Sequence, residues 1–421
     1  MALLEYIRFT PMRECIANGV VNWEIDRIGP VIERLPQIFW STGDSWSEVN
    51  LWAADRTTSV SGSDMKTISA LMKHLCAYAD WLEAEGIDWR HFPKRMADRC
   101  LVRYRGNLIR QRDSGLLKPS TTTARMRAVI QFYRFSLVQG FVSRNAPVWK
   151  DRMAVIRYFD VTGFERTLMR VSSDLAIPNR ARPGLALEDG LTSIGAEHVK
   201  NLLEFTAAEQ LDAIHLMLSL GFFTGARIGT ITTLRVGSVE DAMPDPTMTD
   251  LYRIPVGPGT GVQTKFSVSG DLLVPRFLID ALRRYSYSIP RLARQAKATA
   301  ECRHLLFLTS RGNPYRPESF NRLMTDLRRR AVRQGLHFMS AFRFHQTRCT
   351  YGTWLMEIAL RVAGEAAAIA FVRDAMFHKD EAVTLRYVRF LQQAPIKAAI
   401  ANEFTVAFSG VSNRNWNSFD A

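Results

Sequence analysis

The chain has 421 residues, 47% of them hydrophobic, and can bury at least two cores, because a single core usually stops growing at roughly 250–300 residues. Its net charge of +14 indicates a polyanionic partner. Its five cysteines are odd in number and form no C-x-x-C pair, which fits a reducing compartment and argues against structural zinc. The first residues form no secretory signal and no apolar run could span a bilayer, so we expect a cytoplasmic protein without a membrane partner.

Residues 1–56 differ from the rest of the chain in charge, with five basic and eight acidic side chains. A DNA-binding arm would need an excess of cations, so we do not expect one here. The tryptophans and apolar runs of this N-terminal extension indicate packing, either onto the next domain or onto a neighbouring protomer. The sequence leaves its role open.

Residues 57–172 hold twenty basic and ten acidic side chains and are expected to form a helical DNA-binding domain. Apolar residues that recur at helical spacing predict one face of a helix, and this helix should end at Gly86. The face is formed by Ile68, Leu71, Met72, Leu75, Ala79 and Leu82. A second helix is expected after Pro119, with Ser120 and Thr121 as available caps. The excess of cations suits phosphate contacts better than an ordinary solvated face, which remains the alternative. These cations are Lys94, Arg95, Arg99, Arg103, Arg105, Arg110, Arg112, Lys118, Arg125, Arg127 and Arg134.

A linker is expected over residues 173–191, where prolines and small polar residues show no hydrophobic period. A second domain should follow over 192–402, with a tail at 403–421. Residues Thr206–Glu209 match a capping box that would start a helix, and residues 251–256 and 266–274 read as short strands around a glycine- and proline-rich turn. The predicted fold is mainly α with a small antiparallel β-sheet.

Three short motifs carry the chemistry: Thr224-Gly-Ala-Arg227, His345-Gln-Thr-Arg348, and His378 followed nine residues later by Tyr387. Arginine binds phosphate oxygens with two parallel hydrogen bonds and stays protonated, and histidine can accept the proton that a tyrosine nucleophile must lose. Taken singly, each residue has a plain structural explanation, such as a helix-end cation or a packed aromatic ring. Together, two arginines, two histidines and a late tyrosine supply the side chains that covalent attack on a phosphodiester would use.

These motifs resemble those of the tyrosine recombinase (phage integrase) family, over about residues 60–400. The resemblance implies a helical core-binding domain followed by an α+β catalytic domain. It assigns Tyr387 as the nucleophile that forms a 3′-phosphotyrosyl link, Arg227 and Arg348 as ligands of the non-bridging oxygens, and His345 as the proton acceptor. His378 would donate a hydrogen bond to a non-bridging oxygen. No metal or nucleotide cofactor is expected.

The resemblance also places a lysine on the hairpin as general acid for the 5′-oxygen, and Lys265 is the candidate, although an exposed lysine that blunts a sheet edge is the competing explanation. Three positions depart from the family pattern. Thr230 replaces a frequent acidic residue, Phe344 a common proline, and Phe377 a usual glycine. None of the three removes a reacting group.

We therefore expect a site-specific DNA recombinase or integrase of a mobile genetic element, acting on double-stranded DNA. Strand exchange would require a tetrameric synaptic complex, and partner recombinases remain an open alternative. A stripe after the nucleophile is expected to dock on the next protomer or to pack on its own domain; it consists of Ile396, Ile400, Phe404 and Phe408. Two other functions stay open, a catalytically silent DNA-binding accessory protein and a type IB topoisomerase. The target site and the direction of the reaction cannot be read from the sequence.

Overall fold

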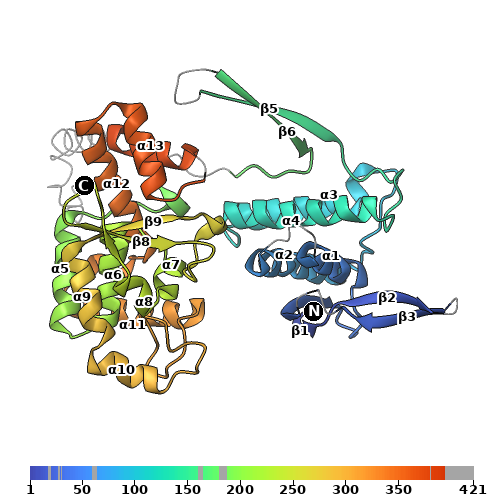
Figure 1. The fold of residues 1–421 in the computed structure, drawn as a ribbon. Helices are drawn as coiled ribbons and strands as arrows, with labels where there is room; N and C mark the ends of the chain where they lie inside the picture. Colours follow the sequence, from blue (N-terminus) through green and yellow to red (C-terminus); the bar gives the residue numbers. More distant parts are fainter. Residues whose placement is uncertain are drawn as a thin grey trace, which may run out of the picture. The chain divides into compact units, whose positions relative to one another are not determined.

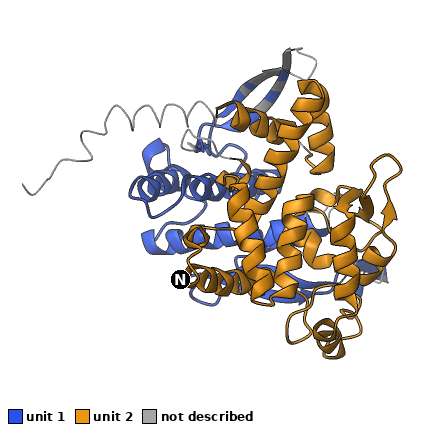
Figure 2. Ribbon diagram, turned by 90° about the vertical axis from the view of Figure 1, so that its left-hand side faces the viewer, with its two compact units in different colours: residues 1–183 blue, residues 184–421 orange. Residues whose placement is uncertain are grey.

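The computed structural model describes residues 1–17, 20–26, 29, 31–58, 64–159, 165–179, 187–379 and 381–393. The chain divides into two compact units, residues 1–183 and 184–421, which are coloured separately in Figure 2. The expected tail at 403–421, the apolar stripe at 396–408 and residues 180–186 of the expected linker lie outside the described residues. The helix-rich architecture with small antiparallel sheets confirms the predicted fold class (Figure 1).

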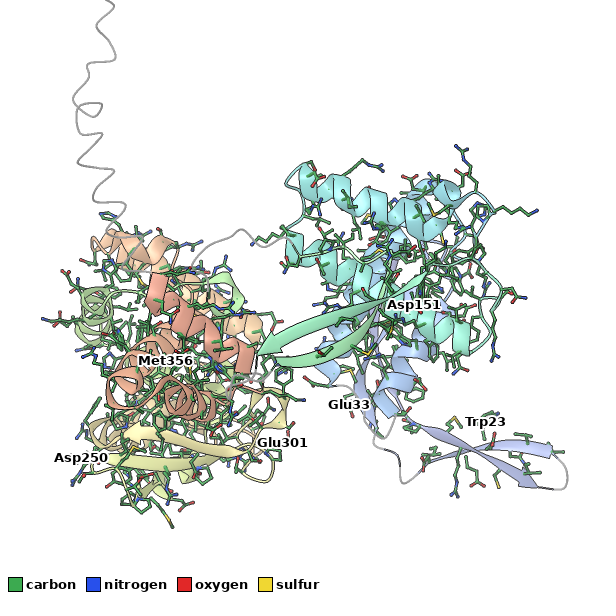
Figure 3. All side chains as sticks on the ribbon, turned by 90° about the horizontal axis from the view of Figure 1, so that it is seen from above. Trp23, Glu33, Asp151, Asp250, Glu301 and Met356 are labelled. Carbon is green, nitrogen blue, oxygen red and sulfur yellow. The ribbon has the colours of Figure 1, made fainter. Side chains whose placement is uncertain are left out.

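The first unit begins with four strands that the sequence patterns did not predict. Strands β1 (Leu3–Phe9) and β4 (Ile32–Phe39) pair antiparallel, and β2 (Met12–Ala17) pairs with β3 (Val20–Ile25). Trp23, labelled in Figure 3, lies on β3 and is 62% exposed. Trp46 and Trp52, by contrast, are almost fully buried in the core that the following helices form, so part of residues 1–56 shares that core.

Five helical segments follow: α1 (Ser47–Thr58), α2 (Met65–Glu85), η1 (Met96–Asp98), α3 (Cys100–Asp113) and α4 (Pro119–Val138). Gly86 ends α2 in the left-handed conformation, with φ 62°, as its place in the sequence predicts. The expectation that Ser120 or Thr121 caps α4 is wrong. Pro119 takes the first helical position, because it lacks an N–H and its φ suits that position, so Lys118 becomes the N-cap.

An antiparallel hairpin, β5 (Asp151–Phe159) and β6 (Glu165–Ser173), closes the first unit and was also not predicted. The core beneath the helices is strongly aromatic. The Trp46 ring lies 5.5 Å from Phe132, and the Tyr78 hydroxyl lies 2.8 Å from that of Tyr133, which in turn donates to the Trp89 carbonyl. The hydroxyl groups of Tyr78 and Tyr133 are therefore paired with each other and with the backbone, as buried polar groups require.

The second unit is built mainly of helices. Its helical segments are η2 (Glu188–Gly190), α5 (Ala196–Ala208), α6 (Asp212–Thr224), α7 (Ile228–Thr233), α8 (Val236–Glu240), η3 (Lys265–Ser267), α9 (Arg276–Ser286), α10 (Ile289–Ala296), α11 (Pro317–Arg333), η4 (His337–Ser340), α12 (His345–Val362) and α13 (Glu365–Ala375). Residues 381–393 are helical as well. One three-stranded antiparallel sheet has the order β7 (Met243–Pro244), β8 (Leu251–Val256), β9 (Gly270–Pro275).

Helix α6 crosses the middle of this unit and is buried on nearly all sides. A methyl group on Gly221 would collide with the Thr347 side chain, so this side chain of α12 packs directly on the backbone of α6. The capping box expected at Thr206 is wrong, because Thr206 lies near the end of α5. Its hydroxyl donates to the Leu203 carbonyl and lies 2.9 Å from His215 Nδ1. In the described part of the chain, no helix combines the length and the apolarity that crossing a membrane requires.

Candidate active site

The side chains from the three motifs converge on a carboxylate that the sequence did not single out, that of Glu188 in η2. Glu188 Oε1 accepts a hydrogen bond from Arg348 Nε at 2.9 Å and one from the Tyr387 hydroxyl at 3.0 Å. His378 Nε2 lies 2.9 Å from the same oxygen. Glu188 itself is buried, with 8% of its surface exposed. One oxygen atom thus gathers an arginine, a histidine and the candidate nucleophile.

The second carboxylate oxygen faces the two remaining motif residues. Arg227 Nη2 lies 3.4 Å from Glu188 Oε2, and His345 Nε2 approaches the same oxygen at 3.4 Å. Asp189 Oδ2 lies 3.6 Å from that histidine nitrogen. His345 Nε2 is buried, and among the described residues it has no partner with hydrogen-bond geometry. A polar ring nitrogen is therefore directed at the anion without being satisfied by it.

Arg348 is fixed by the backbone. Its Nη1 donates to the Gly225 carbonyl at 2.7 Å and its Nη2 to the Met376 carbonyl at 2.6 Å. The residue is 1% exposed. Because both terminal nitrogens are tied to rigid carbonyls, the Nε edge of the guanidinium has a set direction, and that direction is toward the Glu188 carboxylate.

Arg227 is positioned by the turn between α6 and α7. Gly225 ends α6 in the left-handed conformation, with φ 64°, and Thr224 accepts a hydrogen bond from the Ala226 N–H at 3.2 Å. Arg227 is then the N-cap residue of α7, so its side chain leaves from a fixed point. Burial, and next the charge of Arg348, lower the pKa of Arg227. Two guanidinium groups held this close favour an anion between them.

His378 is positioned by the end of α13, which forms a Schellman motif. The Phe377 N–H donates to the Asp374 carbonyl and the His378 N–H donates to the Arg373 carbonyl, at 3.1 and 2.9 Å. Phe377 adopts φ 51°, the left-handed conformation that glycine adopts without strain, which accounts for the glycine usual at this position. His378 Nδ1 then pairs with Thr384 Oγ1 at 2.9 Å, and burial lowers the pKa of His378.

Tyr387 lies in the helical stretch 381–393 and is fully buried. A methyl group on Gly352 of α12 would stand 2.6 Å from Tyr387 Cε1 and 2.7 Å from Met376 Sδ, so the ring rests directly on the helix backbone. Burial raises the pKa of the phenol far above its usual range, and the negative charge of Glu188 raises it further. The Tyr387 hydroxyl is therefore held protonated in this state.

The charge state of Glu188 follows from its neighbours. Burial alone would raise the pKa of this carboxyl, but the imidazoles of His345 and His378 and the guanidinium of Arg348 hold it well below the usual range. The group is therefore an anion at neutral pH. A buried anion with cationic and neutral donors around it is a stable arrangement only while the set stays complete.

Lys265 is not brought to this carboxylate. It lies exposed in η3, between β8 and β9, and its Nζ stands 5.1 Å from the Phe266 ring centroid. Lys379, directly after His378, points to the same ring at 5.9 Å. The hairpin is connected to the site by packing, because the Phe377 ring lies against Gly270 of β9. Two lysines are thus available near one edge of the site.

The other departures from the family pattern also have a place in the structure. Phe344 is the N-cap of α12, and its ring meets that of Phe320 edge-on at 5.1 Å. Thr230 is buried in α7. Glu188, which the sequence reading missed, lies within the expected linker. The one signal for it was an acidic pair, Glu188 and Asp189, between two leucines in a stretch of otherwise small residues.

No family model matches the chain, and no curated protein matches it either. Solved structures similar to it include the Tn1549 transposon integrase (residues 82–397) in complex with circular intermediate DNA, at 13% identity and TM-score 0.49, covering 81% of this chain and 94% of that one. A lambda integrase (75–356) dimer bound to a COC′ core site has 12% sequence identity and a TM-score of 0.45, and the match covers 80% of this chain and 93% of that one. XerA recombinase has 13% sequence identity and a TM-score of 0.35, and the match covers 83% of this chain and 96% of that one. All three are tyrosine recombinases. The functional assignment depends on the geometry of the site.

Proposed function

We propose that this chain is a site-specific tyrosine recombinase, which cuts and rejoins DNA through a covalent link to Tyr387. One observation carries the proposal: two arginines, two histidines and one tyrosine hydroxyl surround a single negatively charged group, the carboxylate of Glu188. Arginine and histidine donors that already hold an anion can stabilise the extra charge that a phosphate gains in the transition state, because they need no rearrangement. The proposed substrate is therefore a phosphodiester in double-stranded DNA.

In the proposed step, Tyr387 Oη bonds to phosphorus and the bond from phosphorus to the 5′-oxygen breaks. The products are a 3′-phosphotyrosyl link and a free 5′-hydroxyl. Arg227 and Arg348 hold the non-bridging oxygens, His378 donates to one of them, and His345 accepts the phenol proton. One ester bond replaces another, so the step needs no oxidant, reductant or nucleotide. We expect it to proceed without a metal.

The 5′-oxygen needs a proton as it leaves. We propose Lys265 as its donor, with Lys379 as the competing donor, because both ammonium groups reach the Phe266 ring at the edge of the site. Phe266 and Ser267 have φ 64° and 53°, a conformation that costs non-glycine residues free energy. Such a loop can change shape when a duplex binds, and Lys265 then moves with it.

DNA contacts in the first unit are proposed from exposure. Five of the expected cations donate to protein groups, and so have part of their hydrogen-bonding capacity already used; they are Arg99, Arg103, Arg105, Arg112 and Arg134. Four others are exposed, and within the described ranges no ion pair holds them; they are Lys94, Arg110, Lys118 and Arg127. We propose that these four bind phosphates. Replacing one by alanine should reduce the slope of log K against log salt by about 1.

The proposal also sets the assembly. Exchange between two duplexes, each cut at two sites, requires four protomers in one synaptic complex. A type IB topoisomerase would instead relax supercoils as a monomer. Relaxation of a plasmid without a recombination site, together with no exchange between two sites, would support that alternative.

The test is covalent trapping on a nicked duplex whose short 5′-hydroxyl fragment diffuses away after cleavage. We expect a protein–DNA adduct that survives denaturation, joined through Tyr387, and formed in the presence of EDTA. If the protein binds a duplex that contains its recombination site and forms no adduct, the catalytically silent accessory protein is favoured instead. An adduct joined through another residue would refute the site.

A further inference from the structure

The Glu188 carboxylate matches a phosphodiester in charge and in acceptors. It carries one negative charge and presents two oxygens, as the two non-bridging oxygens of a phosphodiester do. Both of its oxygens are engaged by groups that the proposed reaction assigns to the phosphate, at distances from 2.9 to 3.4 Å. At these distances a phosphate and this carboxylate cannot occupy the site together.

The turn that carries Glu188 is built to hold it there. The Leu187 N–H donates to the Leu191 carbonyl at 2.7 Å, the Leu191 N–H donates back to the Glu188 carbonyl at 3.0 Å, and Asp189 adopts φ 52°. Leu187 is 1% exposed and belongs to the core cluster that contains Tyr387. These hydrogen bonds and the burial of Leu187 fix the backbone of Glu188, so the position of its side chain follows from the fold.

A second role for Glu188 would be permanent support of Arg227, since the acidic residue frequent three positions after that arginine is Thr230 here. The distances favour a different centre. Arg227 makes one of the two longest contacts, at 3.4 Å, whereas Arg348 and Tyr387 lie at 2.9 and 3.0 Å. The carboxylate thus lies within hydrogen-bond distance of the Tyr387 hydroxyl, where the phosphorus must lie.

We propose that Glu188 is an internal competitor for the scissile phosphate: it occupies the anion site in the absence of DNA and is displaced when the duplex binds. The inference rests on the proposed function. Glu188 follows the boundary between the two units, at Pro183 and Gly184, by only four residues. The Glu188 side chain has to leave the anion site before Tyr387 can reach phosphorus. The competition lowers the affinity for DNA and keeps the arginines neutralised until a substrate arrives.

The experiment compares Glu188→Gln with the wild-type protein and with a matched control. Glu197→Gln removes the same charge from an exposed position in the same unit, at the start of α5. Thermal unfolding is followed while inorganic phosphate is added. In wild type and control we expect little response to phosphate, because the site is occupied. In Glu188→Gln we expect a lower midpoint without phosphate and a rise of several degrees with it, because phosphate displaces the neutral side chain and supplies the negative charge that the site has lost.

The second readout is the rate of covalent adduct formation on the nicked duplex. At low DNA concentration Glu188→Gln should form adduct at least threefold faster than wild type, and the two rates should converge when DNA is saturating. A slower rate at saturating DNA, or a phosphate response equal to that of Glu197→Gln, would overturn the proposal.

If Glu188→Gln does not fold, Leu187→Ala loosens the turn and keeps the carboxylate. The same gain at low DNA is then expected, and its absence counts against the proposal. If wild type forms no adduct at all, the proposed function fails, while the phosphate titration still decides whether Glu188 fills an anion site.

Discussion

Replacing Arg348 with lysine keeps one positive charge in the centre of the site but removes the fork that holds it. The arginine donates to the Gly225 carbonyl, the Met376 carbonyl and the Glu188 carboxylate in three directions. An ammonium group on a shorter chain can serve one of the two carbonyls, so at least one buried carbonyl loses a charged donor. That loss costs about 1.5–3 kcal/mol, which is about 3–12 °C in the midpoint of a unit of this size.

The expected effect on catalysis is large even though the positive charge is kept. A lysine drawn toward a carbonyl no longer directs a donor at the phosphate, and removing one such donor costs about 3 kcal/mol in the transition state, or roughly a hundredfold in rate. The assay is adduct formation on the nicked duplex, beside thermal unfolding. Arg361→Lys, at an exposed arginine of the same helix α12, is the matched control. An Arg348→Lys rate within threefold of wild type would refute the reasoning.

Four further predictions follow from the site. Tyr387→Phe should bind the duplex normally and form no adduct, and an adduct in this variant would remove the nucleophile assignment. Lys265→Ala should regain activity on a 5′-phosphorothiolate substrate, whose sulfur leaves without a proton; rescue of Lys379→Ala alone would transfer the general-acid role to that lysine. Gly352→Ala should destabilise the protein by about 1–3 kcal/mol through overpacking against the tyrosine ring and slow adduct formation, which unfolding curves and trapping rates measure. Because burial lowers the pKa of His378, the unfolded state binds more protons near and below pH 6.5, so stability should fall as pH drops from 7 to 5; the fall should be smaller in His378→Gln.

The parts of the fold that the sequence predicts are those with long periodic patterns. The face from Ile68 to Leu82 matches α2, and Gly86 ends the helix where expected. The strand at 251–256 is also found as predicted. The strands β1 to β4 were missed, because their short alternations are interrupted by charged residues, and four of seven side chains in β1 and all six in β3 are exposed. Periodicity reports burial, so it fails for the hairpin of β2 and β3, whose second strand is exposed along its whole length.

The candidate site divides in the same way. Each motif arginine, histidine and tyrosine was named from the sequence, because a short fixed spacing connects each of them to a neighbour. Glu188 could not be named, because its partners lie between 39 and 199 residues away along the chain. The direction of the Arg348 side chain could not be predicted either, because it depends on the backbone carbonyls of Gly225 and Met376. Every residue has a backbone carbonyl, so the sequence does not indicate which ones accept a hydrogen bond.

The contacts at Gly221, Gly225 and Gly352 bear on how variation in this protein should be interpreted. A methyl group at each would collide with the side chain of Thr347, Tyr351 or Tyr387 respectively, so each of these three side chains packs directly on a glycine backbone. A mutational scan scored by activity would rank these glycines beside the reacting residues, although none can take part in chemistry. Only a scan scored for abundance as well would tell them apart, since loss of a reacting hydroxyl leaves the protein level nearly intact and loss of these glycines lowers it.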